Sequence, residues 1–390
     1  MLIKKGLVYT EEGRFEELSI LTDGDRISGL LPAQAMIKYA GEVFDASGCY
    51  VLPGLVDVHF HGCAGHDFCE GTTEALEKIA AYEFSQGVTG ICPATMTLPE
   101  GRLLEILGNA KRYYDGICGS RDGKDLEQKP EGRARLLGIH LEGPFINPEK
   151  RGAQRLEGSQ APNKEMLVKF QEAAGGLIRL VTIAPEMEGG IACMKEYRAR
   201  DPKVHFSIGH TLSDYDTVRE FFKAGGDHVT HLYNAMPAFS HRAPGVVGAA
   251  FDEPNCFVEL ICDGIHVSPS VVRATFQMFG EDRVVLISDS MEATGMPDGT
   301  YELGGQKVHV TGRHATLSDG TLAGSVTNLY ECMKNAVAMG IPLESAVKAA
   351  TINPCRSIGV DKEFGSISVG KAAKFLILDA KDLSIRKVIT

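Results

Sequence analysis

Between residues 54 and 355, short apolar runs alternate with longer segments of helical character. The short runs are rich in Val, Ile and Leu and are bounded by turn residues, a pattern typical of strands that are buried on both faces. The eight predicted strands span residues 55–61, 88–95, 136–142, 178–184, 204–210, 228–231, 257–262 and 284–289.

Helical segments are expected between most of these strands, for example at residues 73–86, 164–173 and 213–223. Strands that alternate with helices form parallel sheets. Eight such units over about 250 to 300 residues predict a TIM (β/α)8 barrel. An open, doubly wound parallel sheet is the structural alternative.

The two ends of the chain have a different pattern. Short β-prone pieces separated by Gly and Asp turns fill residues 1–53, and similar pieces follow residue 364. Neither end has enough strands to be stable alone. We therefore predict a small discontinuous β-sandwich domain from residues 1–53 plus 356–390. The barrel would span residues 54–355, with a β-hairpin insertion around 298–320.

Composition is that of an ordinary globular protein, with 390 residues, 44% of them hydrophobic and 23% charged. The formal net charge of −11 argues against nucleic-acid or anionic-membrane partners, because both need a basic surface. The ten cysteines include no Cys-x-x-Cys pair, and no long apolar run is present. These features predict a cytoplasmic protein with free thiols.

Residues of metal-ligand type stand at the ends of five predicted strands. His59 and His61 are two positions apart and would face the same side of a strand. A barrel gathers the C-terminal ends of its strands at one rim, so these side chains should converge. A single rim histidine is usually a packing residue, but burying five unpaired polar groups would cost too much free energy. The five are His61, Glu142, His210, His231 and Asp289.

Imidazole and carboxylate ligands suit Zn²⁺ or another first-row divalent metal. An ion with an open coordination position lowers the pKa of a bound water, so the residue types predict a hydrolase. Asp289 has no basic neighbour in the adjacent sequence, and it could accept the proton of the water and pass it to a leaving group. Its alternative role is that of a further metal ligand.

Six blocks of the chain carry a resemblance to a known family. They are residues 53–62 (PGLVDVHFHG), 140–145 (HLEGPF), 209–211 (GHT), 230–236 (THLYNAM), 263–266 (DGIH) and 288–289 (SD). Together they resemble the N-acetylglucosamine-6-phosphate deacetylases of the amidohydrolase superfamily. The similarity covers nearly the whole chain, and the HLEGP and HLYNAM blocks are its most specific parts.

The resemblance implies roles for individual residues. Glu142, His210 and His231 match the main metal ligands, and Asp289 matches the catalytic acid/base. His59 and His61 match a second metal site that only some members keep. One or two ions per subunit are therefore expected, with zinc preferred over iron, manganese, cobalt or nickel.

The resemblance also implies a substrate, a phosphorylated amino sugar that would be deacetylated to glucosamine 6-phosphate and acetate. The positions expected to bind it are Ala153, Gln154, Asn234, Ala235, Arg242, His266, Leu322, Ala323 and Gly324. Similar enzymes are homodimers in which the neighbouring subunit completes the phosphate site. We therefore expect a homodimer.

One position departs from the family pattern. Gln154 follows Gly152 and Ala153, where some relatives carry a histidine that contacts the scissile carbonyl. Glutamine can donate a hydrogen bond through its amide but cannot be a cation. We expect the metal to polarise the carbonyl and Gln154 to assist.

Two other functions are compatible with the sequence. A different amidohydrolase, such as an N-acyl-amino-acid deacylase or a cyclic amidase, would use a similar barrel. The end of the fourth strand, residues 184–186, has no lysine for a carbamylated metal bridge, which disfavours the cyclic amidase. A non-catalytic barrel scaffold would be expected to have lost metal ligands, whereas this chain keeps the whole set.

Overall fold

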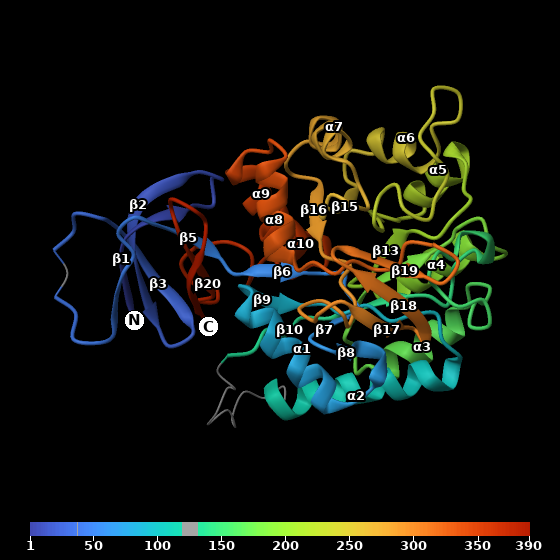
Figure 1. Ribbon diagram of the computed structural model, residues 1–390, viewed down its shortest axis with the longest axis horizontal. Helices are drawn as coiled ribbons and strands as arrows, with labels where there is room; N and C mark the ends of the chain where they lie inside the picture. Colours follow the sequence, from blue (N-terminus) through green and yellow to red (C-terminus); the bar gives the residue numbers. More distant parts are fainter. Residues whose placement is uncertain (37, 119–131) are drawn as a thin grey trace.

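The computed structural model describes residues 1–36, 38–118 and 132–390. Its larger unit is a parallel barrel surrounded by helices (Figure 1). Eight strand positions among the described residues form the wall, and the third position is split in two. They are β6 (Leu55–Asp57), β9 (Val88–Ile91), β10 (Arg135–Leu136) with β11 (Ile139–Glu142), β12 (Ile178–Ile183), β13 (His205–Ile208), β14 (His228–Val229), β15 (Phe257–Ile261) and β16 (Val284–Ile287). The predicted fold class is confirmed.

Hydrogen bonds join the wall into a ring. One sheet has the order β10-β9-β6, and the other runs from β11 to β16 in sequence order. A bridge between Ala94 and His140 joins them on one side. On the other side the N–H of Asp289 donates to the carbonyl of His59 at 2.9 Å. Most strands are shorter than predicted because the chain turns into a rim loop before the end of the predicted run, whereas β11 extends to Glu142.

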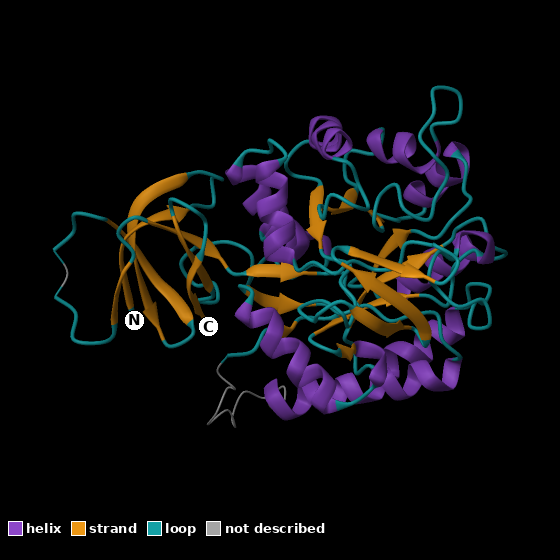
Figure 2. Cartoon of the chain, viewed as in Figure 1, coloured by secondary structure: helices purple, strands orange, loops and turns teal. Residues whose placement is uncertain are grey.

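Figure 2 shows helices on the outside of the barrel strands. They are α1 (Thr73–Ser85), α2 (Glu100–Cys118), α3 (Lys164–Ala173), α4 (Gly190–Arg200), α5 (Tyr215–Lys223), α6 (Gly245–Phe251), α7 (Pro269–Phe279), α8 (Leu329–Ala338), α9 (Leu343–Ala350) and α10 (Ile352–Ser357). Several begin at a side-chain cap: Thr72, Asp214 and Asn328 each accept a backbone N–H from the first turn. In the described ranges no helix combines the length and apolarity that crossing a membrane requires.

The two chain ends build a second unit, in which strands from both ends of the chain lie in one sheet (Figure 1). Its strands form one hydrogen-bonded sheet in the order β21 (Ile385–Ile389), β20 (Phe375–Asp379), β5 (Cys49–Pro53), β1 (Leu2–Tyr9), β2 (Phe15–Asp23) and β3 (Arg26–Pro32), and β4 (Val43–Asp45) also pairs with β1. Strand β4 pairs with the first half of β1, and β5 pairs with the second half. The unit has its own core, which includes Ile3, Ile20, Val51 and Phe375.

Some details of this unit differ from the sequence prediction. Residues 365–370 were expected to form a strand, but the segment is irregular and meets β3 where Gly370 donates to the carbonyl of Ile27 at 2.8 Å. Strand β5 was not predicted, although it is the strand that joins the two chain ends. Helix α10 crosses the predicted boundary between residues 355 and 356, and the domain division stays a prediction.

The insertion after the last barrel strand forms an antiparallel sheet of β17 (Gly299–Leu303), β18 (Gln306–Thr311) and β19 (His314–Leu317). The predicted hairpin is thus extended by a third strand. Gln306 donates to the carbonyl of Ala153, and Arg313 donates to the carbonyl of Asp263, each at 2.6 Å. These bonds fasten the insertion to two rim loops, so it forms a wall of the barrel mouth.

Candidate metal centre and active site

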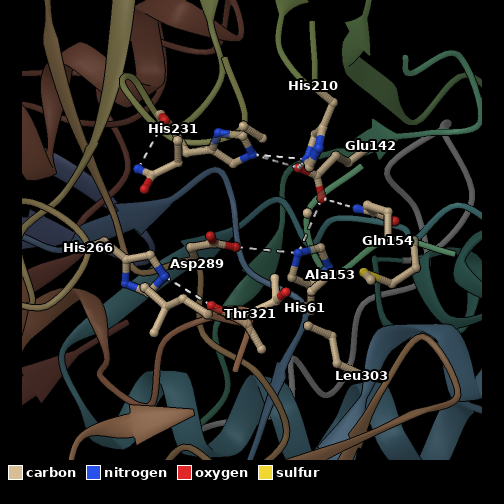
Figure 3. Close-up of a pocket in the computed structure, with 17 residues that line it drawn as sticks. His61, Glu142, Ala153, Gln154, His210, His231, His266, Asp289, Leu303 and Thr321 are labelled. Atoms are coloured by element: carbon tan, nitrogen blue, oxygen red, sulfur yellow. Dashed lines mark hydrogen bonds and ion pairs between the residues drawn. The ribbon is translucent and has the colours of Figure 1, made fainter. Parts of the chain in front are cut away.

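Glu142, at the end of β11, is the centre of the site (Figure 3). Its Oε1 atom lies 3.1 Å from Nε2 of His210 and 3.2 Å from Nε2 of His231. The two imidazole nitrogens are 3.1 Å apart. Ligand atoms around a tetrahedral zinc ion stand roughly 3.4 Å from one another. The three side chains are therefore spaced to hold one ion.

His59 and His61 form a second group around Glu142. Both histidines were predicted to lie on one face of a strand. Strand β6 ends at Asp57, however, so both lie in the loop beyond it. Nε2 of His59 is 3.4 Å from Oε1 of Glu142, and Nε2 of His61 is 3.2 Å from Oε2. Nε2 of His59 is buried and has no hydrogen-bond partner among the described residues. The group therefore fits a divalent cation, to which Nε2 of His59 would donate its lone pair.

The electrostatics of Glu142 suit a ligand. Burial alone would raise its pKa, but the charge of His59 and hydrogen bonds from His210 and His231 hold the pKa well below its usual range. The carboxylate is therefore ionised at neutral pH, the form that binds a metal.

Asp289 lies beside the second group. Its Oδ1 atom is 3.4 Å from Nε2 of His61 and 3.6 Å from Nε2 of His59. Burial would raise the pKa of Asp289, but the hydrogen bond from His61 and the charge of His59 lower it. An ionised carboxylate at this position can either bind a cation or accept a proton.

Three site residues have an unusual backbone conformation. The φ angle is +49° at His210, +28° at His231 and +49° at Asp289. Such left-handed conformations cost a residue with a side chain roughly 1–3 kcal/mol. Each of the three follows the end of its strand by two positions and lines the pocket. Gly209 makes the turn before His210 possible, because a Cβ there would lie 2.6 Å from the Cβ of Thr230.

A cavity of about 260 Å³ opens beside these groups. All but one of the predicted substrate-binding residues line it, namely Ala153, Gln154, Asn234, Ala235, His266, Leu322, Ala323 and Gly324. Arg242 does not line this cavity and is exposed in the loop before α6. Met96, Leu303 and Thr321 also line the cavity but were not singled out from the sequence. Leu303 belongs to the insertion, and Thr321 follows its last strand.

The side-chain amide of Gln154 has a fixed orientation. Its Oε1 atom accepts the backbone N–H of Thr97 at 2.6 Å, and its Nε2 atom donates to Oε2 of Glu142 at 2.9 Å. An amide NH₂ group has two hydrogens, so one remains for a ligand oxygen. Gln154 is thus placed to donate to a carbonyl in the pocket.

His266 lines the pocket as one half of an ion pair with Asp263. Its Nδ1 atom is 2.7 Å from Oδ2 of Asp263, and its Nε2 atom is 3.0 Å from the carbonyl oxygen of Ala323. Both partners are acceptors, so only the doubly protonated ring satisfies both. Burial disfavours the cation, but the hydrogen bond and charge of Asp263 raise the pKa of His266 overall.

Glu259, in the middle of β15, belongs to the site but was missed in the sequence. It is fully buried, its Oε2 atom is 2.8 Å from Nδ1 of His59, and the same atom accepts the backbone N–H of His231 at 3.0 Å. The available signal was a lone carboxylate inside the apolar run FVELIC at residues 257–262. Such a group needs polar partners in a buried strand.

A (β/α)8 barrel that gathers histidines and carboxylates at the C-terminal ends of its strands has the architecture of a metal-dependent hydrolase. The Amidohydrolase family model matches residues 50–390, and the chain belongs to this family.

Individual relatives agree with this assignment. The chain is 35% identical over 381 residues to N-acetylglucosamine-6-phosphate deacetylase of Bacillus subtilis (strain 168), covering 97% of this chain and 93% of the relative. It is 31% identical over 375 residues to N-acetylgalactosamine-6-phosphate deacetylase of Escherichia coli O157:H7, covering 96% and 93%. The structure of a mutant N-acetyl-D-glucosamine-6-phosphate deacetylase from Mycobacterium smegmatis, in complex with N-acetyl-D-glucosamine-6-phosphate, superposes with a TM-score of 0.89 at 29% identity, covering 100% of this chain and 97% of that one.

Proposed function

We propose that this protein hydrolyses the acetamide bond of N-acetylglucosamine 6-phosphate to give glucosamine 6-phosphate and acetate. The observation that carries the proposal is the placement of two histidine pairs around Glu142, with Asp289 beside them at the pocket. The family membership and the names of the relatives point to the same chemistry.

Glu142, His210 and His231 would hold one divalent cation, and His59 and His61, which also lie next to Glu142, would help to hold a second. Zinc suits this nitrogen and oxygen donor set best, and iron, manganese, cobalt and nickel are compatible with it. When bound, such an ion would lower the pKa of a water molecule and polarise the acetyl carbonyl.

Asp289 would move the proton. As an ionised carboxylate it takes a proton from the attacking water while the water oxygen bonds to the acetyl carbon. It then gives that proton to the amide nitrogen as the carbon–nitrogen bond breaks, which releases acetate and the free amine. Gln154 would donate its remaining amide hydrogen to the acetyl oxygen.

The sugar and its phosphate would occupy the pocket beside Asn234, Ala235 and the loop at residues 322–324. His266 lines the pocket as a protonated ring whose charge is paired with the carboxylate of Asp263. Arg242 is exposed outside the pocket of its own subunit, and we place it in the phosphate site of a partner in a homodimer. Phe239, in the same loop, is 51% exposed and would be covered by that partner.

The compartment is a further part of the proposal. The nine cysteines whose side chains are described are all free, and free thiols persist in a reducing compartment. We therefore place the reaction in the cytoplasm.

An acetate-release assay tests the proposal. The purified protein would be given N-acetylglucosamine with and without the 6-phosphate, N-acetylgalactosamine 6-phosphate and an N-acetyl amino acid, beside elemental metal analysis. We expect fastest turnover of N-acetylglucosamine 6-phosphate and one or two ions per subunit. Faster turnover of the amino acid would favour the N-acyl-amino-acid deacylase. A protein that carries no bound metal and releases no acetate from any of these compounds would favour a scaffold.

A further inference from the structure

Glu259 lies outside the pocket, yet it contacts both histidine groups. Its carboxylate is completely buried in β15. Oε2 is 2.8 Å from Nδ1 of His59 and 3.0 Å from the backbone nitrogen of His231, and Oε1 is 3.3 Å from Nε2 of His228. Oε2 thus accepts hydrogen bonds from one residue of each group, His59 and His231.

The contact with His59 decides which nitrogen of the ring is available. A carboxylate accepts a hydrogen bond only from a protonated nitrogen, so Nδ1 of His59 carries a hydrogen. Nε2, which faces Glu142 at 3.4 Å, then holds the lone pair in the neutral ring. Carboxylate partners of this kind orient metal-binding histidines and increase their basicity.

The contact with His231 acts on the backbone. His231 has a φ angle of +28°, a conformation that is unfavourable for a residue with a side chain. The hydrogen bond from its N–H to Glu259 satisfies a buried backbone donor in that turn, which would cost free energy if it had no acceptor. The same side chain therefore helps to hold the imidazole of His231 toward Glu142.

We propose that Glu259 is a positioning residue that sets the ring of His59 and the backbone of His231, and thereby the affinity of both halves of the site for divalent metal. The inference rests on the metal centre of the proposed function. It adds that this centre depends on a carboxylate one layer below the ligands, in the interior of the barrel.

The test compares Glu259→Gln with a matched control. Gln keeps the shape of the side chain but removes the charge. The control is Asp227→Asn, because Asp227 also pairs with a histidine at 2.8 Å, through Nδ1 of His205, but stands before β14 at the opposite end of the barrel. Zn²⁺ and Co²⁺ affinities would be measured by competition with a chromophoric chelator. Thermal unfolding of the metal-free proteins would be followed by circular dichroism.

We expect Glu259→Gln to weaken metal binding by roughly 10- to 100-fold and to alter the visible spectrum of bound Co²⁺. Asp227→Asn should leave both unchanged, even if it lowers the melting temperature. Equal metal affinities for wild type and Glu259→Gln would overturn the inference. If Glu259→Gln does not fold, Glu259→Asp carries the test, since it keeps the charge but draws it away from His59; unchanged metal affinity there would also overturn it.

The two proposals fail in different ways. A wild-type protein that binds no divalent metal contradicts the proposed function itself. A wild-type protein that binds metal and releases acetate, with Glu259→Gln equal to it in metal affinity, contradicts only the role of Glu259.

Discussion

Asp289→Asn separates proton transfer from metal binding. Asparagine has the shape of aspartate but cannot accept a proton at neutral pH. The backbone bond from residue 289 to the carbonyl of His59 does not involve the side chain and should survive. The contacts of the carboxylate are with His59 and His61, so the group formed by Glu142, His210 and His231 keeps its geometry.

The expected loss follows from the role of the carboxylate. A positioned general acid or base contributes typically 10²–10⁴-fold to a rate, equivalent to about 2.7–5.5 kcal/mol of activation free energy. We therefore expect kcat for acetate release to fall by roughly 10²- to 10⁴-fold, with little change in the melting temperature. The ion held by Glu142, His210 and His231 should remain.

The assay is steady-state acetate release from N-acetylglucosamine 6-phosphate, run beside elemental analysis of the same preparations. Asp227→Asn serves as the control for loss of a half-buried carboxylate elsewhere in the barrel. A kcat within 10-fold of wild type would refute the assignment of Asp289 as acid and base. Loss of all bound metal would instead assign Asp289 as an essential ligand.

Three further predictions follow from the same geometry. His59→Asn combined with His61→Asn should remove one equivalent of metal and leave the other; elemental analysis that finds none would make this pair indispensable. Arg242→Ala should raise KM for the phosphorylated sugar by roughly 10- to 100-fold, as expected for loss of a charged hydrogen bond, and far more than for the unphosphorylated sugar; equal changes would remove Arg242 from the phosphate site. His205 and Arg198 lower the pKa of Asp227 against the effect of burial. The ionised carboxylate therefore stabilises the folded protein above the unfolded-state pKa of about 4, and this stabilisation is lost as pH falls through the lower pKa of the folded state. Asp227→Asn should thus cost about 1.5–3 kcal/mol at pH 7 and little at the acid end of a urea-unfolding series; an equal cost at all pH values would contradict this reasoning.

The sequence was most informative about the barrel. Parallel strands buried on both faces appear as continuous apolar runs, and each predicted run contains an observed strand. The same property placed Glu142, His210, His231 and Asp289 at one rim, because each stands at the end of such a run. Strand β5 was harder to find, since only a single residue, Gly54, separates it from β6.

Conformation and long-range pairing were not predictable in the same way. The positive φ angles of His210, His231 and Asp289 were not predictable from residue type, because His and Asp adopt such conformations more often than most residues but still only in a minority of cases. The exposed position of Arg242 depends on the path of its loop, which residue order does not determine. Glu259 stands 200 positions from its partner His59, and no periodic pattern links the two.

The interior below the metal centre explains why a carboxylate is needed there. His140 also lies next to His59, with ring centroids 4.4 Å apart, but burial and the charge of His59 lower the pKa of His140 to about 3. His140 is therefore neutral and adds no positive charge, and its Nε2 atom bonds to Oγ1 of Thr182 at 2.7 Å. Burial would raise the pKa of Glu259, but the charge of His59 and the contact with His228 hold it well below its usual range. This layer thus places one negative charge beneath a site built for cations, in an interior where an uncompensated charge would be costly.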